Sequence, residues 1–269
     1  MSGSAPPGPQ AEPLDLAALR AALAPLTLGR PLIYLPVVES TNTHALRLAR
    51  SGAAEGTLVV TDDQPGGRGR VGRVWQSMPR QQVLCSLVLR PDFPPHFLVM
   101  ASALAVAEAV ETVTGVRPDI KWPNDVLAAG RKLCGILIET GSTAANGLYA
   151  VVGIGLNVNG NLGDNPELAQ RATTLEQLAG HALQREAVAA RLLAGLAERY
   201  AELQRGGEAA RARVRAAWRA RLVTLGAQVR LAQSGQVEEG VAEDVDGDGA
   251  LLLRRADGQL LTVTWGDVS

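Results

Sequence analysis

Apolar and polar residues along the chain follow two spacings, and each spacing predicts a type of secondary structure. Short runs that alternate or are rich in β-branched residues predict strands at 32–35, 57–61, 82–89, 120–122, 126–127, 132–139 and 148–158. Helical spacing predicts helices over 14–26, 43–50, 99–113, 175–178, 185–203 and 208–221. Strands that alternate with helices and then give way to a helical run indicate an α+β or α/β core.

The pattern changes at Leu222, where short strands and turns begin and continue to Ser269. This stretch predicts a small all-β module of the SH3-like barrel type. Within it, 244–249 imitates the start of a calcium loop, but the glutamate expected at the twelfth position falls on Arg255, so we expect a hairpin turn. The chain is thus expected to have three regions: 1–27, flexible with a short helix; 28–221, the main domain; and 222–269.

Composition narrows the class of protein. With 26 Lys and Arg against 27 Asp and Glu, no general field for DNA or an anionic membrane is expected. The N-terminus lacks the basic and apolar regions of a signal peptide, and the longest apolar run, 97–107, is too short to span a bilayer and predicts a buried helix. Cys85 and Cys134 lie in apolar runs, so we expect reduced core residues of a cytoplasmic protein, without metal-binding spacing.

Lysine is rare in this chain, and its position is informative. Only two of the 26 basic residues are lysines, Lys121 and Lys132, and both lie in one stretch, Lys-Trp-Pro-Asn-Asp at 121–125 and Arg-Lys-Leu-Cys-Gly at 131–135. A lysine is a compact point charge with rotatable donors, whereas arginine is a planar fork. The two lysines could lie together by chance, but they are candidates for a role that arginine cannot fill.

A glycine–arginine loop lies between two predicted strands. Residues 67–72, Gly-Arg-Gly-Arg-Val-Gly, match the dinucleotide fingerprint, but Pro79 and a strand follow where that fingerprint requires a helix. Glycine backbone N–H groups together with Arg68, Arg70 and Arg73 favour binding of an anion. A solvated basic loop and an RG-type nucleic-acid element are the alternatives.

Four segments then lie in order along the chain: Ser40-Thr-Asn42; Gln64 with Gly67-Arg-Gly-Arg-Val-Gly-Arg-Val-Trp75; the lysine stretch; and Gly153-Ile-Gly-Leu-Asn157. Together they resemble the biotin protein ligases, strongly over 32–160 and more loosely beyond. The resemblance implies an α+β fold: a mixed β-sheet catalytic domain of the class II synthetase-like, biotin and lipoate ligase type, with flanking helices and a C-terminal SH3-like β-barrel. It also implies that biotin and ATP, accompanied by Mg²⁺, form biotinyl-adenylate, and that a lysine of the biotin carboxyl carrier protein of acetyl-CoA carboxylase then receives the biotinyl group.

The resemblance also assigns roles to single residues. Lys132 matches the lysine that bridges the biotin carboxylate and the α-phosphate, and it acts in catalysis with Arg68, Arg70 and Asp125, the last orienting or deprotonating the acceptor amine. The implied biotin-binding residues are Ser40, Thr41, Asn42, Gln64, Gly67, Arg68, Gly69, Arg70, Lys132 and Gly135, whose missing side chain leaves room for the ligand. The implied ATP- or adenylate-binding residues are Arg68, Arg70, Arg73, Trp75, Lys132 and Asn157. The magnesium ligands stay unnamed.

The resemblance leaves alternatives open. Lipoate protein ligases and octanoyl transferases share the catalytic fold, and a non-catalytic biotin-responsive regulator is a second alternative. The residues before the first core strand are too few for a DNA-binding winged helix, so no DNA partner is expected. The family includes monomers and homodimers, and either state is compatible with the sequence.

Overall fold

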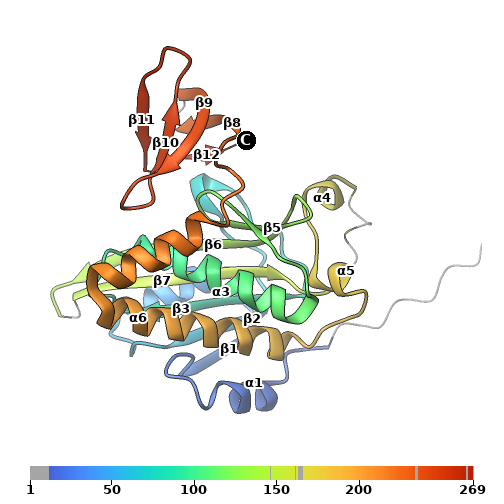
Figure 1. Cartoon of the computed structure of the whole chain (residues 1–269). Coiled ribbons are helices and arrows are strands. Elements are labelled where there is room, and N and C mark those ends of the chain that lie inside the picture. Colours follow the sequence, from blue (N-terminus) through green and yellow to red (C-terminus); the bar gives the residue numbers. More distant parts are fainter. Residues whose placement is uncertain are drawn as a thin grey trace, which may run out of the picture.

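The main body is built on a seven-stranded sheet (Figure 1). The computed structural model describes residues 12–145, 147–160, 162, 166–233, 236–264 and 266–268, so residues 1–11 of the segment expected to be flexible lie outside the described residues. From edge to edge the strands are β1 (Leu32–Val37), β2 (Leu58–Asp63), β3 (Gln82–Leu89), β7 (Gly147–Asn157), β6 (Arg131–Thr143), β5 (Asp125–Ala128) and β4 (Asp119–Lys121). The β1–β2 pair is parallel and the other pairs are antiparallel, which confirms the mixed sheet.

Helices cover the two faces of this sheet unequally. α3 (Phe97–Thr114) and α6 (Arg185–Arg219) pack together over one face (Figure 1) and bury a large apolar core that includes Val152. α2 (Thr41–Arg50) lies on the opposite face, where Val151 belongs to a smaller cluster. Because side chains alternate across a strand, odd-numbered residues of β7 face α2 and even-numbered residues face the main core.

The helices differ in two ways from those expected. The segments 185–203 and 208–221 are joined in α6, although Gly207 has a non-helical backbone (φ 53°, ψ −145°), so the expected break is a kink inside one element. α1 (Leu16–Leu23) and α5 (Leu175–Ala179) lie within or beside expected helices, whereas α4 (Pro166–Arg171) was not predicted.

Helix α3 is long and apolar enough to cross a membrane by length and composition, yet 67% of its residues are buried inside the protein. The buried helix predicted from the run 97–107 is therefore confirmed. Cys85 and Cys134 are also buried and unpaired, as expected.

The C-terminal module is a second, five-stranded antiparallel sheet with the order β11 (Leu260–Val263), β10 (Leu251–Arg254), β9 (Gln236–Val245), β8 (Gln228–Gln233) and β12 (Asp267–Val268). It stands at one end of the main body (Figure 1), where the Trp122 indole donates to the Gly249 carbonyl at 3.0 Å. Asp246 Oδ1 accepts from the backbone N–H groups of Asp248 and Ala250 in the β9–β10 turn, both at 2.9 Å. The predicted hairpin turn is therefore confirmed.

Candidate active site

A patch of glycine on the α2 face of the sheet forms the floor of the site. Gly135 of β6 and Gly155 of β7 lie opposite each other in the strand pairing. The ring of Trp75 packs on both: a Cβ added to Gly155 would lie 2.7 Å from Trp75 Cε2, and one added to Gly135 would lie 2.9 Å from Cζ3. Side chains at these positions would displace the indole. The space beside Gly135 holds Trp75 and also borders the central cavity, so the expectation that Gly135 makes room for the ligand stays a prediction.

One end of the site is polar and neutral. Ser40 caps α2, accepting from the Thr43 backbone N–H, and the helix begins with Thr41 and Asn42 pointing at the sheet. Gln64 Oε1 accepts from the Thr41 backbone N–H at 3.3 Å, and the Ser86 hydroxyl donates to Asn42 Oδ1 at 2.6 Å. These buried polar groups are hydrogen-bonded to one another, which fixes their orientation before any ligand arrives.

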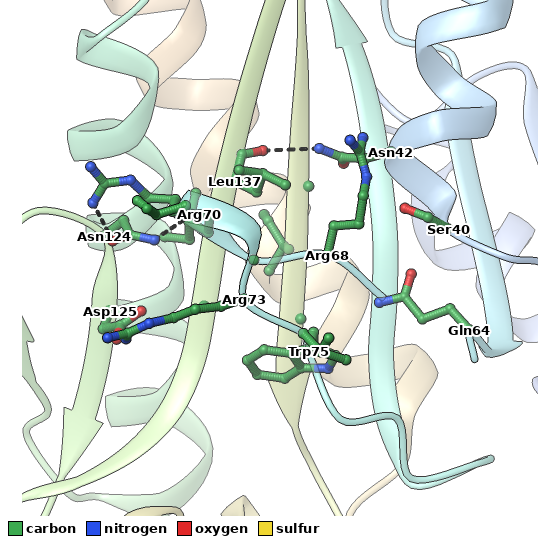
Figure 2. Close-up of a pocket in the computed structure, with 18 of the residues that line it drawn as sticks. Ser40, Asn42, Gln64, Arg68, Arg70, Arg73, Trp75, Asn124, Asp125 and Leu137 are labelled. Atoms are coloured by element: carbon green, nitrogen blue, oxygen red, sulfur yellow. Dashed lines mark hydrogen bonds between the residues drawn. The ribbon is translucent and has the colours of Figure 1, made fainter. Parts of the chain in front are cut away.

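The glycine–arginine loop covers the side of the site that faces away from the sheet. The Trp75 backbone N–H donates to the Gly67 carbonyl at 2.9 Å, which closes the loop on itself. Figure 2 shows that its three arginines diverge: Arg68 extends towards Asn42, Arg70 reaches Asn124, and Arg73 lies alongside Asp125. Arg68 Nη2 lies 2.7 Å from Glu139 Oε2, and Arg70 Nη1 donates to Asn124 Oδ1 at 3.0 Å. The tip residue Val71 has a φ of 52°, a left-handed conformation that is strained for a β-branched residue.

The other end of the site concentrates positive charge around one carboxylate. Lys132 Nζ lies 2.7 Å from Asp125 Oδ1 and 5.6 Å from the centre of the Trp75 ring. Lys121 lies opposite Asp125 in the β4–β5 pairing. With Arg70 and Arg73 nearby, one carboxylate stands among four cations.

Burial makes this charge costly. It lowers the pKa of Arg70, an effect opposed by the attraction of Asp125 and increased by the repulsion of Arg73. Burial likewise lowers the pKa of Lys121, where Arg73 and Lys132 add repulsion and Asp125 again opposes it. Cations that are partly desolvated and mutually repelling favour the arrival of an anionic ligand.

The structure brings most of the predicted site residues into one central cavity. Its lining includes the predicted residues Ser40, Thr41, Asn42, Gln64, Arg68, Gly69, Arg70, Arg73, Trp75, Asp125, Lys132 and Gly135. Gly67 instead supports Trp75 from the side, where an added Cβ would lie 2.7 Å from the Trp75 carbonyl oxygen. Asn157 lies outside this cavity, hydrogen-bonded to Gln82 at 2.8 Å, in an adjoining cavity that shares Trp75 and Lys132.

Sequence reasoning missed several residues of the site. Ser86, Asn124 and Glu139 hold Asn42, Arg70 and Arg68, respectively. Asn124 lies inside the lysine stretch, so its motif was a usable signal. Ser86 and Glu139 occur in predicted strands, and nothing local distinguishes them from ordinary strand residues.

No metal centre is formed by the part of the chain that the structure describes, because no group of three or more His, Cys, Asp or Glu side chains comes together there. The carboxylate nearest the cavity, Asp125, is paired with Lys132. These residues do not fit a dedicated metal site.

Comparisons with known proteins agree with this geometry. Residues 34–157 match the Biotin/lipoate A/B protein ligase family and residues 224–269 match the Biotin protein ligase C terminal domain. The chain is 37% identical over 267 residues to the biotin–[acetyl-CoA-carboxylase] ligase of Mycobacterium tuberculosis, covering 95% of each protein. It is 37% identical over 245 residues to the bifunctional ligase/repressor BirA of Bacillus subtilis, covering 89% of this chain and 74% of that protein.

A solved structure extends the likeness to three dimensions. The biotin protein ligase of Aquifex aeolicus, determined in complex with biotin and ATP, superposes with a TM-score of 0.75 at 29% identity, over 89% of this chain and 98% of the other. The fold and the site together define a ligase that joins a small carboxylic acid to a protein. The chain belongs to the Biotin/lipoate A/B protein ligase family, among its biotin protein ligases.

Proposed function

We propose that this chain activates biotin with ATP and transfers the biotinyl group to a lysine of the biotin carboxyl carrier protein of acetyl-CoA carboxylase. The observation that carries this proposal is the cation cluster around Asp125, joined to a neutral polar pocket by a floor of glycine. A pocket of this kind suits a ligand that is uncharged at one end and carboxylate at the other. Biotin has this character.

The neutral end holds the ureido ring of biotin. Ser40, Thr41, Asn42 and Gln64 supply donors and acceptors there, and their mutual hydrogen bonds keep them in place. Binding uncharged polar groups with prearranged partners costs little reorganisation. Gly69 lets the loop backbone approach the ligand closely, and Gly135 acts indirectly by seating Trp75.

The cationic end carries the first step. A biotin carboxylate oxygen attacks the α-phosphorus of ATP, a new P–O bond forms, and pyrophosphate leaves. Both reactants are anions, so Lys132, Arg68 and Arg70 offset their repulsion in a site where the charges are already placed. Lys132 bridges the two groups, because a point charge with rotatable donors follows both as the geometry changes.

The nucleotide occupies the side of the site beyond Trp75. The adjoining cavity is lined by Trp75, Lys132 and Asn157, and Arg73 lines the central cavity alongside Asp125. The Trp75 indole N–H is buried without a hydrogen-bond partner among the described residues, so it is a donor available to the ligand. Mg²⁺ arrives bound to the phosphates of ATP.

The second step transfers the biotinyl group. The acceptor lysine amine attacks the carbonyl carbon of the adenylate, AMP leaves, and the amine loses a proton. Asp125 orients the incoming ammonium and accepts that proton, because it is the carboxylate that lines the cavity. Its ion pair with Lys132 must open or be shared for this to occur.

We also propose a cytoplasmic location, since Cys85 and Cys134 are free thiols, and no DNA partner, since the net charge is −1. The working state is a monomer or a homodimer. Light scattering with and without biotin distinguishes the two.

The proposed function is tested by mixing the purified protein with ATP, Mg²⁺, biotin and a biotin carboxyl carrier domain, then measuring the intact mass of the carrier. The expected result is a gain of one biotinyl group that requires both ATP and biotin. Parallel reactions contain lipoate or an octanoyl donor in place of biotin. Modification in those reactions alone would move the chain to the lipoate branch of the fold.

A further inference from the structure

Glu139 occupies a junction between the pocket and the loop. It lies on β6 four residues beyond Gly135, so both are on the same face of the strand. Its partner in the β6–β7 pairing is Val151. One carboxylate oxygen, Oε2, accepts from Asn42 Nδ2 at 2.9 Å and lies 2.7 Å from Arg68 Nη2. Glu139 does not line the central cavity, so it acts on the site through these two partners.

The pocket side of this junction is rigid. Asn42 is buried, and its Oδ1 accepts from the Ser86 hydroxyl while its Nδ2 faces Glu139. A carboxylate only accepts hydrogen bonds, so Glu139 requires the amide nitrogen of Asn42 to face it. Asn42 also fits tightly over the sheet, since a Cβ added to Gly153 would lie 2.1 Å from Asn42 Oδ1. The amide has one orientation, which Glu139 fixes together with the Leu137 carbonyl, a second acceptor 3.3 Å from Nδ2.

The loop side of the junction is more open. The Arg68 side chain is 44% exposed, against 26% for Glu139. The Arg68–Glu139 pair ties one side of the loop to β6, and the Arg70–Asn124 hydrogen bond ties the other side to the β4–β5 turn. The strained backbone of Val71, at φ 52°, directly follows Arg70. The pair with Glu139 therefore opposes a tendency of the loop to leave this conformation.

We propose that Glu139 is a positioning residue that couples the ligand pocket to closure of the glycine–arginine loop. A ligand held by Asn42 stabilises the carboxylate that holds Arg68, and the closed loop in turn slows escape of the ligand. Coupling of this kind is reciprocal, so loss of Glu139 weakens both loop closure and ligand retention. The ligand is biotin if the proposed function is correct; the coupling of Glu139 to the loop does not depend on that identity.

The test compares Glu139→Ala and Glu139→Gln with Glu202→Gln. Glu202 pairs with Arg213 at 2.8 Å on α6, so its variant removes an Arg–Glu pair away from the site. Glu139→Ala should raise the KM for biotin about tenfold, because Asn42 keeps only its longer hydrogen bond to the Leu137 carbonyl and the loop loses its anchor, while kcat at saturating biotin stays within about twofold. Glu139→Gln keeps one acceptor and should show a smaller rise, of roughly threefold.

Loop closure is measured separately, without ligand, by trypsin. Mass spectrometry follows cleavage after Arg68, Arg70 and Arg73, and we expect Glu139→Ala to be cut about three- to fivefold faster than wild type, and Glu202→Gln at the wild-type rate. Equal loop cleavage in wild type and Glu139→Ala would overturn the coupling, even if the wild-type protein did not activate biotin. A fall in kcat with unchanged KM, accompanied by a lower melting temperature, would show a merely structural role and overturn it as well.

Discussion

One face of strands β6 and β7 packs in the core and the other forms the floor of the site, although the residues of the two faces alternate in sequence. On the face towards α3 and α6, Ile136, Ile154 and Leu156 are buried in the main core. On the other face, Gly135 and Gly155 carry no side chain, and the ring of Trp75 lies on them. Because neighbouring residues of a β-strand face opposite sides of the sheet, residues that stabilise the fold alternate with residues that form the site.

The largest effect is expected from a substitution on the core face. Leu156→Ala removes a side chain that is 0% exposed, so the free energy of unfolding should fall by about 2–5 kcal/mol. Urea unfolding monitored by circular dichroism measures this loss. Biotin-dependent activity per folded molecule should be close to that of wild type, and a loss of activity out of proportion to unfolding would show that the faces are not separate.

Substitution of the neighbouring residue, Gly155, should lower activity rather than stability. Gly155→Ala places a methyl group where Trp75 now lies, at 2.7 Å from Cε2, and displacing the indole from the site should lower kcat/KM for biotin about tenfold. The main core is on the other side of the strand, so the denaturant midpoint should change little. A variant with normal kinetics and a lowered midpoint would contradict the proposed seat for Trp75.

The smallest effect is expected at a second pair of neighbours, Cys134 and Gly135. Burial raises the pKa of the Cys85 thiol to about 12 and that of Cys134 well above its usual range. Only the thiolate reacts, so at pH 8 iodoacetamide should leave both cysteines unmodified in the folded protein and alkylate both after unfolding in guanidinium. Modification of Cys134 at the rate of an unfolded control would show that the core face is open to solvent.

The sequence predicted more of this arrangement where the information is local. Alternation placed the strands, and the lysine stretch brought Lys121, Asp125 and Lys132 together because a tight turn joins them. Contacts between distant segments were not predictable in the same way. Asn42 and Glu139 are 97 residues apart and meet only because the strand order places α2 over β6 and β7.

The glycine residues also show where prediction from the sequence ends. The glycines of β6 and β7 indicate that something approaches the sheet closely. The sequence does not say what approaches, and in the structure it is Trp75, from a distant loop, that lies against Gly135 and Gly155. The tertiary fold determines which side chain packs on a given surface, and the sequence of that surface does not.

We propose that the cationic end of the glycine-floored pocket activates a carboxylate, with Lys132 as its bridging charge. Exchange of radiolabelled pyrophosphate into ATP, measured with and without biotin for wild type and Lys132→Arg, tests it most directly. We predict exchange that depends on biotin in wild type and falls about 100-fold or more in Lys132→Arg, because a planar guanidinium cannot replace the point charge. Wild-type exchange rates in Lys132→Arg, or exchange that does not require biotin, would contradict the account.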